Sequence, residues 1–276
     1  MRIITDTASL ISPAEGEAQG LTILPICVSM QNKTYQDYTQ ITSAEFLDAV
    51  AQGAVPTSSQ PAIGDFLDVL ESTDEEILML TVGDGLSGAY QSAMGARNLV
   101  ENPERVHILN SKTLAGPLHY LAKKAVALKE QGLDIERIKA SLQKCIDSSV
   151  SFVIPEDFAF LQRSGRLTTI VAKLGGALKL LPVLTQTKDK TRITPLGIKR
   201  SWNSAVELIL KQLQALEVGA EHLISVCHAG TVEKAERIRQ QIKECFSATE
   251  TELLELSPSL ITHGGPGCIV IQAIVK

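Results

Sequence analysis

Hydroxyl side chains lie in two short segments of this sequence, and one of these segments is rich in glycine. Residues 83–88 read GDGLSG and lie between the apolar run 75–82 and a helical pattern that ends near residue 100. Free backbone N–H groups at a helix start, together with the helix dipole, favour a bound anion. Residues 57–61 read TSSQP. Together the segments predict neutral donors for one carboxylate or phosphate, whereas either alone fits an ordinary helix cap because Ser is a preferred capping residue.

The segment at residues 83–88 also matches the G-x-G-x-x-G pattern of dinucleotide-binding sites. That pattern requires an acidic residue at the end of the next strand, but the apolar run 105–110 ends in Asn110. The pattern normally follows the first strand of its domain, whereas the run 75–82 is at least the third. The sequence therefore argues against a nucleotide site.

Residues 85–89 read GLSGA, one residue away from the G-x-S-x-G pattern of serine hydrolases. Such an enzyme would use Ser87 as its nucleophile, with a histidine base and an acid that orients the histidine. His228 and His263 lie downstream of Ser87, but no acid stands out as the third member. A serine hydrolase acting through Ser87 stays open as the alternative function.

A third glycine-rich segment, residues 263–267, reads HGGPG and precedes the last apolar run. We expect it to be a loop in which His263 donates to an oxyanion or changes charge near neutral pH, although a purely structural histidine fits equally well. Arg163 and Arg166 flank a Ser-Gly pair, a spacing that also fits the end of an exposed helix. Neither segment identifies a site by itself.

Short apolar runs alternate with helical patterns through the first half of the chain, and this order predicts the type of sheet that carries the loops. The runs cover residues 2–5, 21–28, 75–82 and 105–110. Because strands that alternate with helices need crossover connections, residues 1–150 are predicted to form an α/β domain with a mostly parallel sheet.

The second half has a different order of elements. A hairpin is predicted from residues 182–187 and 191–197, and further strands at 222–228, 252–256 and 268–275 alternate with two helices. Residues 151–276 are therefore predicted to form an α+β domain with a mixed sheet. The groove between the two domains is the expected place for a ligand.

Composition excludes several classes of protein. The chain has 276 residues, of which 44% are apolar and only 4% aromatic, so we expect about two domains with an aliphatic interior. A net charge of −5 argues against nucleic-acid binding, which normally shows a basic excess. The five cysteines are widely spaced without a metal-binding pattern, and no secretion signal is visible, so free thiols in the cytoplasm are expected and no metal is.

Taken in order, ten segments resemble the DegV family of bacterial fatty-acid-binding proteins. They read IITDTASL, LPICV, PTSSQP, GLSGAYQSA, NSKTLAG, FLQRSGRL, LGGALKLLPVL, PLGIKR, CHAG and HGGPG. The resemblance implies two α/β domains with a long-chain fatty acid in a buried tunnel between them. It implies a carrier that is not itself an enzyme, needs no other cofactor, and presents its ligand's carboxylate to a separate fatty acid kinase, which makes acyl phosphate for phospholipid synthesis.

The resemblance also implies roles for individual residues. The carboxylate is expected to contact residues from the three glycine and hydroxyl segments, namely Ser58, Ser59, Ser87, Gly88 and His263. Arg166 and Arg200 are expected to contact a phosphate or the partner kinase. Residues 201–203 read Ser-Trp-Asn where the family tends to be basic, which reduces the charge of the expected kinase surface. The stretch 170–184, which contains Lys173 and Lys179, could contact a membrane surface transiently during loading.

Overall fold

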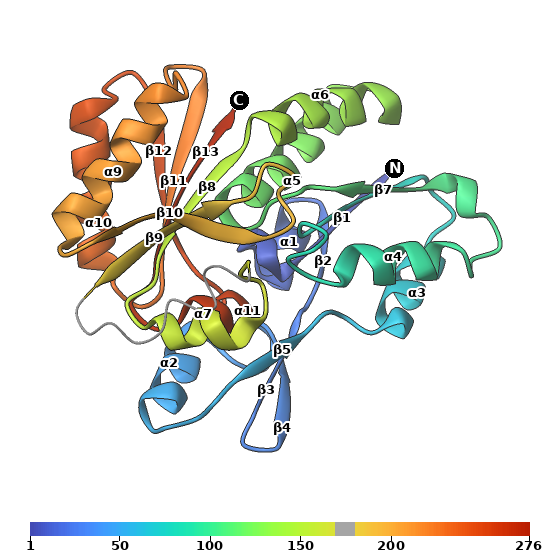
Figure 1. The fold of residues 1–276 in the computed structure, drawn as a ribbon. Coiled ribbons are helices and arrows are strands. Elements are labelled where there is room, and N and C mark those ends of the chain that lie inside the picture. The colour runs from blue at the N-terminus through green and yellow to red at the C-terminus, as the bar shows by residue number, and fades with distance from the viewer. Residues whose placement is uncertain (169–179) are drawn as a thin grey trace. The chain divides into compact units, whose positions relative to one another are not determined.

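The computed structural model describes residues 1–168 and 180–276, which form two compact units (Figure 1). Unit 1 comprises Met1–Asp147 together with Ser257–Ser259, and unit 2 comprises Ser148–Leu256 together with Leu260–Lys276. The sequence analysis assigned Ser257–Ser259 to the second domain, whereas these three residues group with the first unit. Whether the chain folds as two independent domains that meet near residue 150 stays a prediction.

A four-stranded parallel sheet lies at the centre of unit 1, as predicted. Its strands are β1 (Arg2–Asp6), β2 (Leu21–Leu24), β6 (Ile77–Thr81) and β7 (Val106–Asn110), in the order β2-β1-β6-β7. All residues of β6 are buried, which explains its continuous run of apolar side chains. The helices of this unit are α1 (Pro13–Ala18), α2 (Ser43–Ala51), α3 (Ile63–Glu71), α4 (Ala89–Arg97), α5 (Ala115–Glu130) and α6 (Ile135–Ser148).

Unit 1 also contains a small antiparallel sheet that the sequence analysis did not predict. Its strands are β3 (Cys27–Met30), β4 (Lys33–Gln36) and β5 (Thr57–Ser59), in the order β4-β3-β5. The apolar run 21–28 is not one strand, because it divides into β2 and β3 around Pro25, which has no backbone N–H to donate. Residues 57–59 are strand rather than loop, because they pair with β3.

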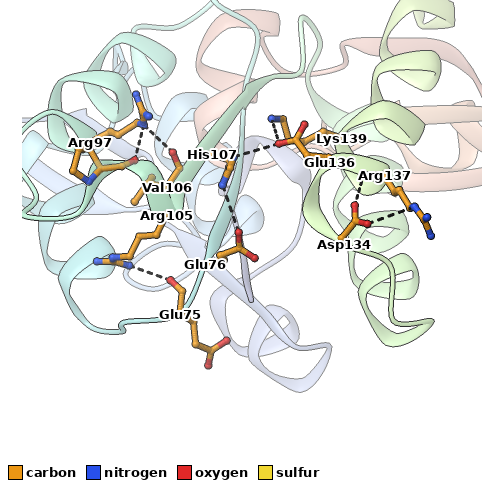
Figure 2. Close-up of polar contacts among 11 residues, drawn as sticks. Glu75, Glu76, Arg97, Arg105, Val106, His107, Asp134, Glu136, Arg137 and Lys139 are labelled. Carbon is orange, nitrogen blue, oxygen red and sulfur yellow. Dashed lines mark hydrogen bonds and ion pairs between the residues drawn. The ribbon is translucent and has the colours of Figure 1, made fainter.

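The helix that follows the 83–88 turn is tied to the sheet by an arginine at its other end. Nε of Arg97 donates to the carbonyl oxygens of Pro103 at 3.0 Å and Val106 at 2.8 Å (Figure 2). On β7, His107 lies between carboxylates, with its ring nitrogens 3.8 Å from Glu76 and 3.9 Å from Glu136 (Figure 2). These contacts fix α4 and β7, whose ends carry Gly88 and Asn110.

Unit 2 is built on a mixed six-stranded sheet, again as predicted. Its strands are β8 (Val150–Ile154), β9 (Leu181–Gln186), β10 (Ile193–Lys199), β11 (His222–His228), β12 (Glu250–Glu255) and β13 (Ile269–Val275), in the order β10-β9-β8-β13-β11-β12. The β11 and β12 pair is parallel and the other pairs are antiparallel. Helices α9 (Trp202–Ala215) and α10 (Val232–Cys245) pack on it through a core that is mainly aliphatic.

Two shorter helices, α7 (Phe158–Ser164) and α11 (Pro258–Gly264), lie at or next to residues of the predicted site, since α11 contains His263 and α7 ends two residues before Arg166. Helix α7 ends at Gly165, whose φ of 70° is left-handed. Helix α11 begins within the segment that groups with unit 1 and ends just after His263. Within residues 1–168 and 180–276, no helix combines the length and the apolar character that a membrane crossing requires.

Candidate functional site

The 83–88 turn of unit 1 is held by hydrogen bonds from three directions. Oδ2 of Asp6, at the end of β1, accepts from the amide of Val82 at 2.9 Å. The amide of Gly83 donates to the carbonyl of Thr113 at 2.7 Å. The amide of Asp84 donates to Oδ1 of Asn110 at 3.1 Å. The turn is therefore placed by the carboxyl ends of β1, β6 and β7, which meet at one edge of the parallel sheet.

Gly83 is required by close packing against the neighbouring backbone. A Cβ at this position would lie 2.9 Å from both the carbonyl carbon of Lys112 and the amide nitrogen of Thr113. Further along the turn, the amides of Leu86 and Ser87 both donate to the carbonyl of Gly83. The two glycines of the turn thus have different functions, because Gly85 adopts a left-handed φ of 85° while Gly83 allows close approach.

Ser87 lies at the start of α4, as predicted. Its Oγ accepts from the amide of Ala89 at 3.2 Å, and Gly88 is the capping residue of the helix. The helical pattern leaves the amides of the first turn, including those of Tyr90 and Gln91, without acceptors inside the helix. This end of α4 therefore presents a hydroxyl and backbone donors next to a residue that has no side chain.

Ser58 and Ser59 occupy β5 and not a helix cap. Ser58 is half-buried and pairs with Val28, whereas Ser59 is exposed and pairs with Cys27. Because successive side chains of a strand point to opposite faces, the two hydroxyls do not lie on one face of the small sheet.

Gln60 connects the two hydroxyl segments. Its side-chain amide packs against Gly88 so closely that a Cβ on Gly88 would lie 3.0 to 3.2 Å from the amide atoms. Its Nε2 lies 3.5 Å from Oγ of Ser92 on α4. The residue after Ser59 is therefore in contact with the residue after Ser87. The sequence analysis did not select Gln60 as a site residue, because a single glutamine between a strand and a proline has no periodic or motif signal.

Asn110 occupies the position at which a dinucleotide site would have an acid, and its side chain supports the 83–88 turn. Its Oδ1 accepts from the amides of Asp84 at 3.1 Å and Lys112 at 2.9 Å. The G-x-G-x-x-G match thus describes a turn fastened to the next strand, which agrees with the sequence-based argument against a nucleotide.

The hydrogen bonds of the histidine at the end of β11 do not favour the hydrolase alternative. His228 is buried, and within the described residues its Nδ1 has no hydrogen-bond partner, whereas a triad histidine donates from Nδ1 to an acid. Labelling with a fluorophosphonate is the direct test, since a carrier's serine should stay unlabelled.

His263 is a half-buried residue of α11 and not part of a loop, because helix α11 continues to Gly264. Burial lowers the pKa of His263 to about 3, and the positive charge of Arg166 lowers it further. The expected change of charge near neutral pH is therefore wrong for this state of the protein. A neutral imidazole can still donate one hydrogen bond.

Arg166 and Arg200 lie at opposite ends of β10. The carbonyl of Arg166 accepts from the amide of Ile193, the first residue of the strand, at 3.0 Å, and Arg200 directly follows its last residue, Lys199. Because a strand rises about 3.3 Å per residue, the two arginines are separated by roughly 20 Å along it. They do not form one phosphate site, although a large partner surface could include both.

Asp6 is a buried carboxylate next to the turn that the sequence analysis did not select. Its Oδ1 accepts from the amide of Ala8 at 3.0 Å and its Oδ2 from that of Val82. Burial raises the pKa of Asp6 to about 6, and the nearby Asp37 contributes in the same direction, while the two amides favour the charged form. An Asp directly after an apolar strand is the only sequence signal for this role.

The raised pKa predicts how stability depends on pH. The folded state holds the Asp6 proton more tightly than the unfolded state, where the pKa is 3.8, so the contribution of Asp6 to stability is full below about pH 4 and is lost as pH rises through 6. In Asp6→Asn we expect this fall to shrink by on the order of 2 to 3 kcal/mol. Urea unfolding at pH 4.5 and 7.5 measures it, with exposed Asp48→Asn as the control. Equal pH dependence in Asp6→Asn and the wild type would contradict the assignment.

Other predicted features fall partly outside the described residues. The stretch 170–184 was proposed for membrane contact, and its residues 170–179 lie outside the described part of the chain.

Within the described residues, no group of three or more His, Cys, Asp or Glu side chains could hold a metal ion. The five cysteines are free thiols.

Comparison with known families settles the relationship of this chain. The family model described as uncharacterised proteins of the DegV family matches residues 1–276. The chain belongs to the DegV family. Among relatives of this family, the DegV domain-containing protein SA1258 of Staphylococcus aureus is 26% identical over 99% of this chain and 98% of its own length. YteA of Lactococcus lactis is 28% identical over 100% of this chain and 98% of its own length.

Solved structures of DegV proteins have the same fold. A Thermus thermophilus DegV protein, described for its fatty-acid binding, is 29% identical with a TM-score of 0.89, and the match covers 100% of both chains. A Eubacterium eligens DegV protein loaded with heptadecanoic acid is 22% identical with a TM-score of 0.85, again over 100% of both chains. The α/β fold with a parallel and a mixed sheet is thereby confirmed.

Proposed function

We propose that this protein binds a long-chain fatty acid and holds its carboxylate at the Ser58–Ser59 and Ser87–Gly88 segments of unit 1. The observation that carries the proposal is the packing of Gln60 against Gly88, which brings these two segments together. Hydroxyl and amide donors suit a single carboxylate, which accepts from several donors at once. Fatty-acid binding by the Thermus relative supports the same class of ligand.

His263, on α11, is a further donor in this proposal. A neutral imidazole with one N–H supplies a hydrogen bond to a carboxylate without a formal ion pair. The acyl chain, which the resemblance places in a tunnel between the domains, would contribute most of the affinity. At about 0.8 kcal/mol per buried methylene, a long chain supplies on the order of 10 kcal/mol before ordering costs.

Binding is tested by calorimetric titration of delipidated protein with oleate and palmitate. Saturable binding of both acids supports the proposal if oleyl alcohol, which has the chain of oleate but lacks the carboxylate, binds much more weakly. No heat and no thermal stabilisation with either acid would contradict it, because a ligand of the native state must raise its stability.

We further propose that the protein is a carrier and that the chemical step belongs to a separate fatty acid kinase. The resemblance supports this role, with Arg166 and Arg200 as contacts for the kinase or the phosphate. Residues where the family tends to be basic have local functions here, since Ser201 caps α9 and the ring of Trp202 lies 4.3 Å from Nζ of Lys234. We therefore expect weaker coupling to a kinase than in relatives with a basic surface.

The carrier role is tested by incubating oleate-loaded protein with a fatty acid kinase and ATP. Acyl phosphate should form only when kinase and loaded carrier are both present. Acyl phosphate formed by the carrier and ATP alone, or none with any kinase that accepts a related DegV protein, would contradict the role. A reducing cytoplasmic location, expected from the free thiols, is part of the same proposal.

A further inference from the structure

One stretch of unit 2 has a charge opposite to that of the whole chain. Residues 158–206 contain nine Lys and Arg side chains and one acid, Asp189, and so have a net charge of +8, whereas the whole chain has a net charge of −5. Asp189 is engaged locally, because its Oδ1 accepts from Oγ1 of Thr187 and from the amide of Thr191. Helix α7 and strands β9 and β10 belong to this stretch. An excess of positive charge of this size attracts anions.

Two arginines of this stretch are held side by side by the backbone. Leu167 forms a parallel bridge with Ile193, in which the amide of Ile193 donates to the carbonyl of Arg166 at 3.0 Å. The amide of Thr168 donates to the carbonyl of Ile193 at 2.9 Å. In a parallel pairing the residues just before the bridged pair, Arg166 and Arg192, are neighbours as well. Because paired strands lie about 4.8 Å apart, the two side chains start close together.

Both guanidinium groups turn toward the end of α7. Nη1 of Arg192 donates to the carbonyl of Gly165 at 2.9 Å, and Nη1 of Arg166 donates to the carbonyl of Ser164. The bridged leucine and isoleucine pack in a small apolar cluster of unit 2. Because successive side chains of an extended chain point to opposite sides, the two arginines lie on the side away from this cluster. The two positive groups therefore converge on consecutive carbonyls.

This arrangement places two like charges next to each other. Arg166 is half-buried and Arg192 is exposed. Burial lowers the pKa of Arg166, and the positive charge of Arg192 lowers it further, yet a guanidinium stays charged in a protein. Within residues 1–168 and 180–276, no carboxylate forms an ion pair with Arg192. Like charges on paired residues are destabilising, and an anion bound to both groups would remove this repulsion.

We propose that Arg166 and Arg192 form a binding site for a phosphate group on unit 2. A guanidinium is planar and presents parallel N–H donors that bind two phosphate oxygens at once. Two neighbouring guanidinium groups also match the charge of a phosphate monoester, which is about −2 at neutral pH. The second arginine of the site is Arg192 and not Arg200, which follows the other end of β10. The site lies within unit 2 and does not require a bound fatty acid.

The test titrates the full-length protein with inorganic phosphate and follows binding by phosphorus NMR. The wild type should bind phosphate saturably, and Arg192→Gln should bind it about tenfold more weakly, as expected for a lost charge-assisted contact. Arg192→Lys keeps the charge but loses the paired donors, so its affinity should lie between the two.

A second arginine of unit 2 provides the matched control. Arg237 on α10 is exposed, and its Nε donates to a backbone carbonyl, that of Glu233, at 3.3 Å. Arg237→Gln therefore removes the same charge and a similar bond from the same unit. Its affinity for phosphate should equal that of the wild type.

Vesicles of phosphatidylcholine, with and without phosphatidic acid, show where the phosphate comes from. Vesicle binding that needs both phosphatidic acid and Arg192 would identify a lipid headgroup, whereas binding of inorganic phosphate alone would identify a soluble phosphate, and both results support the site. The site is overturned if the wild type binds neither, if Arg192→Gln binds as well as the wild type, or if Arg237→Gln loses as much. If neither Arg192 variant folds, Arg166→Lys should weaken binding in the same way. Failure of the proposed function would leave all these results unchanged.

Discussion

Replacing Ser87 with alanine should weaken the binding of oleate by about 5- to 150-fold. This range corresponds to about 1 to 3 kcal/mol, the cost of leaving one oxygen of a buried carboxylate without a donor. The Ser87 hydroxyl can accept from Ala89 and donate to a ligand at the same time, because a hydroxyl has one donor and two acceptor positions. Titration of delipidated protein measures the effect.

A second serine provides the matched control for this variant. Oγ of Ser12 accepts from the amide of Glu15 at 3.2 Å, the same distance as the bond from Ala89 to Ser87. Ser12→Ala should lose stability by about 1 kcal/mol, as expected for a lost cap, and keep its oleate affinity. Unchanged affinity in Ser87→Ala would remove Ser87 from the site, and equal loss in both variants would reduce its role to helix capping.

Gly83→Ala should both destabilise unit 1 and impair ligand binding. The added methyl group would lie 2.9 Å from backbone atoms of Lys112 and Thr113, which cannot move without displacing the segment after β7. Forced packing of this kind costs about 1 to 3 kcal/mol. Because the carbonyl of Gly83 accepts from the amides of Leu86 and Ser87, a shift at Gly83 displaces Ser87 as well.

For a second glycine, Gly64, we expect substitution by alanine to raise stability instead of lowering it. Gly64 lies in the first turn of α3, and a Cβ there would have no atom of the described residues within 4 Å. Gly64→Ala should stabilise the protein, by up to about 1 kcal/mol, because alanine has the higher helix propensity. Urea unfolding and oleate titration of both variants test the pair. A Gly83→Ala protein as stable as the wild type and as tight in oleate binding would show that the turn is not constrained as described.

The sequence could predict elements whose patterns are local. Helix α10 lies between the apolar runs 222–228 and 252–256, where a helix was predicted, and the β9 and β10 hairpin forms at the polar turn between two apolar runs. Strand β5 could not be predicted in this way. Thr57–Ser59 is polar and three residues long, and it is a strand only because it pairs with β3, some thirty residues earlier in the chain.

The sequence indicated the two hydroxyl segments but not the residues that support them. Ser87 could be found because glycines and a helical pattern surround it. Asp6 could not, because its carboxylate acquires its role from burial and from the Val82 amide, which is far away in the chain. The prediction that His263 lies in a loop was wrong, because helix α11 includes His263 and ends only at Gly264.

The central claim is that this protein carries a long-chain fatty acid, and extraction of the purified recombinant protein tests it most directly. Denaturation in organic solvent followed by mass spectrometry should release long-chain fatty acid in an amount comparable to the protein. The same protein, once delipidated, should take up added oleate or palmitate. A protein that yields no fatty acid and also fails to take up either acid would contradict the account.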